Sequence, residues 1–149
     1  MTQQVAQRKA NQSVSTFDLV QYGDVRTVDL PFEQAIQKLE SALKNEGFGV
    51  LCQIDLQAKL KEKLGVDFPR YVVLGVCNPP LAFQALEKDI NLGLLLPCNA
   101  VVYENDGKVR IGAVNAEKIL AVTGRPDLEG PARMVNEKLR RALDSVTIP

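Results

Sequence analysis

The chain has 149 residues, of which 46% are hydrophobic and 24% charged, which is the size and composition of a single globular domain. Its 18 basic and 18 acidic residues cancel, which argues against a protein that binds nucleic acid or an anionic membrane by bulk charge. It contains no histidine, which excludes every catalytic or metal-binding site that needs an imidazole.

The N-terminal segment, residues 1–16, is rich in Gln, Ser, Thr and Asn and predicts a flexible polar tail. A single α+β domain is expected over residues 17–149. No apolar segment follows the basic residues of the tail, so no signal peptide is predicted. The densest apolar stretch, 92–103, is far shorter than the ~20 residues of a membrane span.

Cysteine usage indicates a reducing compartment. The three cysteines, Cys52, Cys77 and Cys98, are too few and of the wrong parity for the disulfide framework of a secreted protein. We therefore expect a cytoplasmic protein that does not associate with a membrane.

The first predicted elements are a short strand at 25–30 and an amphipathic helix that begins around Pro31. The apolar face of this helix comprises Phe32, Ala35, Ile36, Leu39, Ala42 and Leu43. Gly47 is expected to end the helix in the left-handed conformation. The next strand, 48–54, alternates so that Cys52 faces the core, where it would serve packing only.

The middle of the chain predicts helix, strand and helix. Asp55 is expected to cap a short helix whose lysines are spread over a solvated face. The near-continuous apolar run 71–77 predicts a central strand that is covered on both faces. Asn78 and Pro79 then predict the start of a further helix. Its buried stripe comprises Leu81, Ala82, Ala85 and Leu86.

The C-terminal half predicts a hairpin followed by two helices. Strands at 101–104 and 108–113 flank the turn 105–107, whose residues tolerate positive φ. Asn115 is expected to cap a short helix, and a last helix begins at Pro131. Together these elements predict a two-layer α+β fold, with helices packed on one face of a mostly antiparallel sheet.

The second face of this sheet predicts a partner. Several strands keep apolar groups on both sides, as with Leu51 opposite Val50 and Leu74 opposite Val73. A sheet with one face in water alternates more cleanly. We therefore expect a homodimer in which a second copy covers part of this surface. The alternative is that the tail or the last helix of the same chain covers it.

Two short motifs form the candidate site, Cys77-Asn78-Pro79-Pro80 and Leu96-Pro97-Cys98-Asn99. Each places a thiol beside an amide side chain and a proline, and proline fixes the backbone there. Cys77 precedes a predicted helix start, where the helix dipole would favour a thiolate. The candidate ligand-binding residues are Cys77, Asn78, Pro79, Pro97, Cys98 and Asn99, with Cys77 and Cys98 as candidate metal ligands.

Two such thiols could bind a soft metal ion, carry a transient disulfide or hold an electrophile. A structural role is the alternative, because Asn78 is a good helix cap and buried cysteine is a common core residue. The spacing of Cys77 and Cys98 matches neither a zinc knuckle nor a CxxC motif. The thiols would also be well separated if the second strand began at Leu94.

Other chemical motifs are few. The chain has neither GxGxxG nor GxxxxGK[ST], so no phosphate-binding loop is predicted. Tyr22, Tyr71 and Tyr103 are isolated and are interpreted as rim or core aromatics rather than a base-stacking platform. No nucleic-acid partner is therefore expected.

Several segments resemble one known family. They are Gly47-Phe48-Gly49-Val50, Ile54-Asp55, Lys63-Leu64-Gly65, YVVLGVCNPPLAFQAL at 71–86 and GLLLPCNAVVY at 93–103. Over about residues 25–146 the chain is similar to the bacterial and archaeal family called domain of unknown function 302. The resemblance implies a compact dimeric α+β domain with no established activity. It also implies that the six candidate site residues lie at the two motifs of the family.

The chain departs from the family in two places. It carries Asn115-Ala116 where relatives often carry Asp-Pro, and Ile119-Leu120 where methionines are frequent. The second departure weakens any soft-metal site that would use methionine sulfur.

Three classes of function remain open. The first, which we favour, is a binding module that holds a small ligand or a soft metal ion near the two motifs. The second is a thiol-based redox or sulfur-transfer protein with Cys77 or Cys98 as nucleophile. The lack of histidine weakens it, because the thiolate would need another activator. The third is a structural or interaction protein without a ligand, so the sequence favours a non-enzymatic role and identifies no cofactor.

Overall fold

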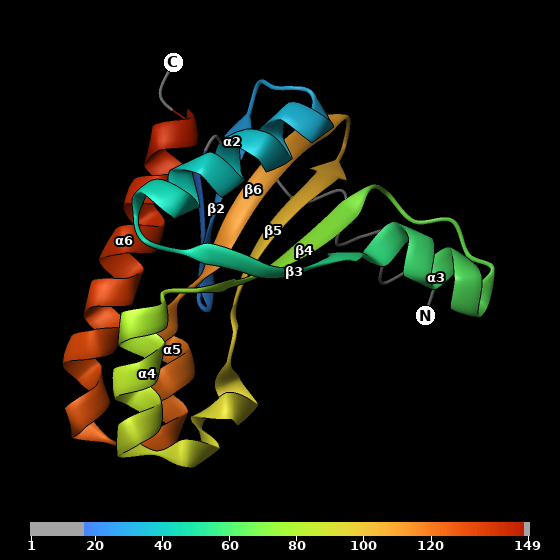
Figure 1. Cartoon of the computed structure of the whole chain (residues 1–149). Helices are drawn as coiled ribbons and strands as arrows, with labels where there is room; N and C mark the ends of the chain where they lie inside the picture. The colour runs from blue at the N-terminus through green and yellow to red at the C-terminus, as the bar shows by residue number, and fades with distance from the viewer. Residues whose placement is uncertain (1–16, 148–149) are drawn as a thin grey trace.

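The computed structural model describes residues 17–147, which form a six-stranded antiparallel sheet with helices (Figure 1). The strands are β1 (Phe17–Val20), β2 (Gly23–Val28), β3 (Gly49–Asp55), β4 (Tyr71–Cys77), β5 (Cys98–Asn105) and β6 (Lys108–Val114). The α-helices are α2 (Phe32–Asn45), α3 (Leu56–Leu64), α4 (Pro79–Lys88), α5 (Ala116–Leu120) and α6 (Glu129–Thr147). Three 3-10 helices are η1 (Ile90–Leu95), η2 (Ala121–Thr123) and η3 (Pro126–Leu128). The polar tail predicted at 1–16 lies outside the described residues.

The strand order is β1-β2-β6-β5-β4-β3, and every neighbouring pair is antiparallel. The predicted hairpin joins β5 to β6 through Asp106 and Gly107, which have φ of 52° and 74°. Both lie in the left-handed region that a two-residue hairpin turn requires. The predicted α+β fold with an antiparallel sheet is confirmed. The edge strand β1 was not predicted.

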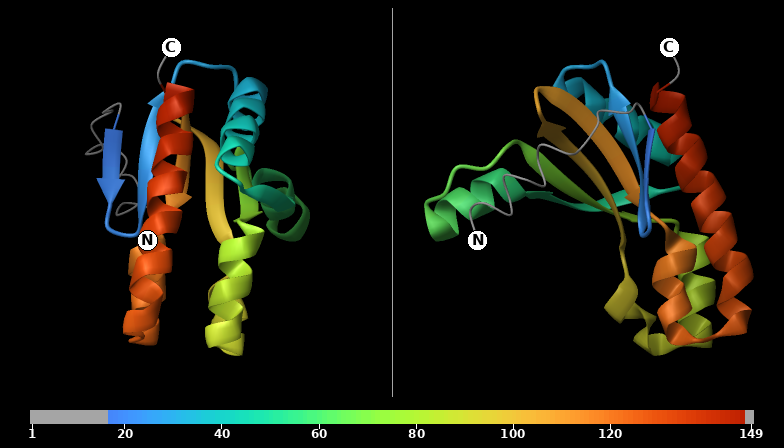
Figure 2. Two further views of the ribbon diagram at one scale, coloured as in Figure 1. Left: turned by 60° about the vertical axis from the view of Figure 1, so that its left-hand side comes forward. Right: turned by 180° about the vertical axis from the view of Figure 1, so that it is seen from behind.

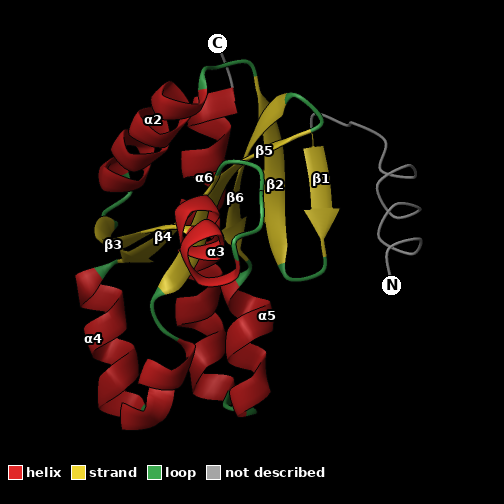
Figure 3. Ribbon diagram, turned by 90° about the vertical axis from the view of Figure 1, so that its right-hand side faces the viewer, coloured by secondary structure: helices red, strands yellow, loops and turns green. Residues whose placement is uncertain are grey.

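The core lies between the sheet and two helices, α2 and α6, which cover the same face (Figure 1 and Figure 3). All six residues of the predicted α2 stripe are buried. On α6 the buried apolar residues include Leu139, Ala142 and Leu143. The helices α4 and α5 lie beyond the end of the sheet and form, with η1 and the first half of α6, a separate helical lobe.

The edge strand β3 corrects one prediction. All of its residues are exposed, and its pairing with β4 shifts between Val50 and Cys52. Such a bulge breaks the alternation of side chains along a strand. Cys52 is therefore exposed rather than directed into the core. Neither is β4 fully covered on both faces, because Tyr71 and Val73 are only half-buried.

The strands β3 and β4 continue into an arm that carries α3 away from the rest of the molecule (Figure 2, right). The cap of α3 is as predicted: the Ala58 amide donates to Asp55 Oδ1 at 2.9 Å. No residue of α3 is buried. The exposed apolar side chains of this β3–α3 arm are Val50, Leu51, Ile54, Leu64, Val66 and Phe68.

Three further predictions need correction. The last helix begins at Glu129 instead of Pro131, and β5 begins at Cys98 instead of residue 101. Tyr71 and Tyr103 are not isolated, because their rings stack at a centroid distance of 5.1 Å. They meet because they are directly paired across β4 and β5. No helix in the described part of the chain is both long and apolar enough to cross a membrane.

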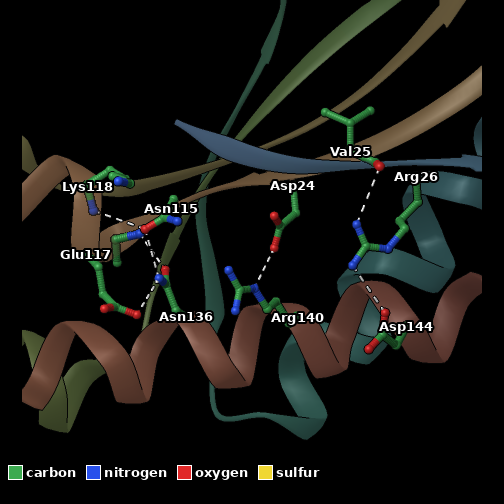
Figure 4. Close-up of polar contacts among 10 residues, drawn as sticks. Asp24, Val25, Arg26, Asn115, Glu117, Lys118, Asn136, Arg140 and Asp144 are labelled. Carbon is green, nitrogen blue, oxygen red and sulfur yellow. Dashed lines mark hydrogen bonds and ion pairs between the residues drawn. The ribbon is translucent and has the colours of Figure 1, made fainter. Parts of the chain in front are cut away.

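Ion pairs hold α6 against β2 (Figure 4). Arg140 Nε donates to Asp24 Oδ2 at 2.7 Å, and Arg26 Nη2 donates to Asp144 Oδ1 at 3.3 Å. Asp24 and Arg26 are both buried, so each needs a partner of opposite charge. These contacts fix the helix along the sheet in addition to its apolar stripe.

Asn136 joins α6 to α5 (Figure 4). Its Oδ1 accepts from the Ala116 amide at 2.5 Å, and its Nδ2 donates to Asn115 Oδ1 at 2.8 Å and Glu117 Oε1 at 3.0 Å. Asn136 is buried, so the amide serves several groups at once within the helical lobe. Asn115 meanwhile caps α5, as predicted, by accepting from the Lys118 amide at 3.0 Å.

Replacing Asn136 with alanine is expected to lower the free energy of unfolding by about 1–3 kcal/mol, because the buried Ala116 amide loses its acceptor. Urea denaturation measures this change. Glu137→Ala, at an exposed neighbouring position, is the matched control and should change stability by less than about 0.5 kcal/mol. Equal stability of the two variants would show that the Asn136 bonds do not hold the lobe together.

Candidate functional site

A cavity of about 430 Å³ lies where the ends of β4 and β5 meet the helical lobe. This volume falls within the range of about 300–1,000 Å³ that is common for small-molecule sites. Apolar side chains supply most of the wall. They include Phe48, Val76, Leu81, Ala82, Ala85, Leu86, Leu92, Leu96, Val114, Ile119, Leu120 and Val135.

The strand register explains why the two motifs meet at this cavity. Val76 of β4 is paired with Cys98 of β5, so the end of one strand lies beside the start of the other. Of the six predicted site residues, five line the cavity: Cys77, Asn78, Pro97, Cys98 and Asn99. The sixth, Pro79, is the first residue of α4 and is absent from the described lining.

Both the oxygen and the nitrogen of the Asn78 side-chain amide form hydrogen bonds within the fold. Its Oδ1 accepts from the Leu81 amide at 3.4 Å, which is the predicted cap of α4. Its Nδ2 donates to the Glu46 carbonyl at 3.4 Å. The amide reaches this position beside Gly47, whose φ of 85° is the predicted left-handed end of α2. Asn78 therefore ties the start of α4 to the end of α2.

Pro97 and Asn99 occupy the other motif. Pro97 packs directly over Gly75 of β4, where a Cβ atom would lie 2.9 Å from Pro97 Cγ and 2.6 Å from Cys52 Sγ. Asn99 is exposed, and its side chain makes no hydrogen bond with the part of the chain that the structure describes. Asn99 is thus the motif amide that is available to a bound molecule.

Both motif thiols are held in the neutral form. Burial raises the pKa of Cys98 to about 11, and the neighbouring Cys77 adds to this rise. Burial also raises the pKa of Cys77. Burial therefore acts against the thiolate character that the helix N-terminus is expected to give Cys77. At neutral pH the pair is poorly suited to nucleophilic attack.

The predicted metal site gains no further ligands. Within the described residues, no group of three or more Asp, Glu or Cys side chains is arranged to hold a metal ion. All three cysteines are free, and no cysteine pair is formed. Ile119 and Leu120, where the chain departs from the family that it resembles, line the same cavity as Cys77 and Cys98. They contribute no sulfur.

The structure corrects the prediction for the apolar stripe of α4. Its apolar stripe was predicted to be buried, yet no residue of α4 is buried, and the stripe faces the cavity. The opposite wall, with Ile119 of α5 and Val135 of α6, was not predicted. A leucine or alanine that lines a cavity gives the same sequence pattern as one in a packed core, so the sequence cannot distinguish the two.

The fold and the cavity define a small α+β domain with an apolar site of ligand size at one end of its sheet. The family model of a domain of unknown function, DUF302, matches residues 25–146, so the chain belongs to the DUF302 family. The chain is also similar to a crystal structure of an uncharacterized conserved DUF302 protein from Bacillus stearothermophilus. The TM-score is 0.80 at 34% identity, over 85% of this chain and 99% of that chain. No curated protein matches the chain.

The three thiols are expected to react in a defined order with a chromogenic disulfide reagent at neutral pH. Exposed Cys52 should react first, and Cys98 last, because its pKa of about 11 leaves almost no thiolate. Cys52→Ser should remove the fast phase. Cys98→Ser, the matched control, should leave it intact.

The slow phase carries the pH dependence. Its rate should keep rising with pH until about pH 11, where the Cys98 thiol ionises. A fast phase that persists in Cys52→Ser, or a Cys98 phase that levels off near neutral pH, would contradict this assignment of the thiols.

Proposed function

We propose that the chain is a small-molecule binding module whose site is the cavity between the strand ends and the helical lobe. The observation that carries this proposal is the 430 Å³ apolar cavity, lined by residues of both motifs. The six residues proposed for the site have different roles. Cys77, Pro97, Cys98 and Asn99 would contact the ligand, whereas Asn78 and Pro79 position α4, the wall of the cavity.

A binding role is better supported than thiol chemistry. The raised pKa values of Cys77 and Cys98 oppose a resting thiolate, and the chain has no histidine to activate one. With two thiols and no third ligand among the described residues, the cavity also offers a soft metal ion an incomplete site. The proposal includes the cytoplasmic location predicted from cysteine usage.

The neutral fluorescent probe N-phenyl-1-naphthylamine tests the site. It should bind saturably, with increased emission, because the cavity would remove it from water. Ala85→Trp, which puts a bulky ring into the cavity wall, should weaken binding by about tenfold or more. Gln84→Trp places the same ring on the exposed side of α4 and should leave binding unchanged. Equal affinity of both variants would refute this location, with thermal melting confirming that each is folded.

We further propose that the chain forms a homodimer in which a second copy covers the β3–α3 arm. Leu51 and Leu64 are 64% and 68% exposed, and four more large apolar residues of the arm are exposed beside them. A cluster of this kind is characteristic of interaction sites. The zero net charge of the chain also leaves little long-range repulsion between copies.

The dimer is tested by sedimentation at micromolar concentration. Wild-type protein should have twice the monomer mass, and Leu64→Glu should shift it towards the monomer by burying a charge at the interface. Leu94→Glu is the matched control, because Leu94 is 88% exposed but lies in the helical lobe. A wild-type monomer, or equal dissociation by both variants, would contradict the proposed interface.

A further inference from the structure

We infer that the ligand of the cavity is an uncharged, mainly apolar molecule with a single hydrogen-bonding end near Asn99. The inference rests on the proposed binding function and names the chemical class of ligand for that site. It follows from which groups line the cavity, which of them are already occupied and where the nearest charges are held.

The first observation is the absence of charge in the lining. Among the described residues that form the wall, none is Asp, Glu, Lys or Arg. A carboxylate or ammonium group placed inside would lose its water and meet no opposite charge. The cavity therefore selects against charged ligands of either sign.

The second observation is that four charged residues of the lobe already have partners within the fold. Lys88 Nζ donates to the Asp127 carbonyl at 2.9 Å, and Arg125 holds the Asp127 carboxylate through bonds of 3.0 and 2.8 Å. A third contact joins Arg125 to Asp89 at 3.9 Å. Lys88, Asp89, Arg125 and Asp127 are all outside the described lining of the cavity. These four charged side chains are therefore engaged outside the cavity and do not pair with a ligand inside it.

The third observation is that polar groups gather at one end. Cys77, Cys98 and Asn99 lie at the strand ends, while α4, α5 and α6 present apolar side chains. The two thiols are uncharged at neutral pH, since burial raises both of their pKa values. The Asn99 amide supplies one donor group and one acceptor without internal partners among the described residues. A hydroxyl, carbonyl or amide at one end of an apolar ligand would satisfy it.

A competition experiment on the full-length chain tests the inference. The competitors of bound N-phenyl-1-naphthylamine are 1-octanol, octanoate and octylammonium, which share a chain length and differ in charge. At about pH 8 octanol is uncharged, octanoate is an anion and octylammonium is a cation. The inference predicts that octanol binds more tightly than either ion by about tenfold or more, because only the ions leave an unpaired charge in the cavity.

Acidification provides a second measurement that needs no variant. As the pH approaches about 4–5, where carboxyl groups take up a proton, octanoate should compete progressively better, while octanol should not change.

Two variants test the lining itself. Leu86→Lys, which introduces an ammonium into the wall, should reverse the preference so that octanoate binds more tightly than octanol. Asn99→Ala should weaken the binding of octanol, because its hydroxyl loses a hydrogen-bond partner.

The outcomes separate the two proposals. Octanol, octanoate and octylammonium displacing the probe equally would overturn the uncharged-ligand inference and leave the binding function standing. So would an octanoate affinity that does not change with pH. No saturable binding of the probe to wild-type protein would overturn both proposals. Preferential binding of octanol together with improved binding of octanoate in acid would support the inference.

Discussion

The register of β4 and β5 is the constraint on which the site depends. Because Val76 is paired with Cys98, the end of β4 and the start of β5 must lie side by side. The chain between them, α4 and η1, can then only leave the sheet and return to it at the same end. This segment forms one wall of the cavity, and the two motifs lie where the segment begins and ends. A shift of the register by one residue would move Cys98 to the opposite face of the sheet.

The second wall depends on the long helix α6, which serves both parts of the molecule. Its 19 residues span about 28 Å, enough to cover the sheet with one half and the lobe with the other. Leu139 and Leu143 pack against the sheet, while Val135 lines the cavity. The ion pairs to β2 and the Asn136 bonds to α5 set where this helix lies. The stability of the fold and the shape of the cavity are therefore coupled.

Local features of the fold could be predicted from the sequence. Asp55, Asn78 and Asn115 cap helices as expected, because a cap depends on one side chain and the amide three residues later. The exposure of β3 could not be predicted. It follows from a bulge at Val50 to Cys52 and from the position of β3 at the edge, and neither is encoded in the alternation of the strand.

The site was predictable only where its residue types are unusual. Two thiols beside amides and prolines single out Cys77 and Cys98, whereas the apolar wall opposite them looks like ordinary core. The pKa shifts of the thiols could not be predicted from the sequence either, because they depend on how deeply the fold buries each thiol.

Methyl NMR during titration with 1-octanol tests the central claim most directly. The account predicts saturable shifts at Ala82 of α4 and Ile119 of α5, which face the cavity from two different helices, with one common dissociation constant. The methyl groups of Leu64 and Val66 on the exposed arm should not follow that curve. Shifts confined to the arm, or linear shifts without saturation at both cavity walls, would contradict the assignment of this cavity as the binding site.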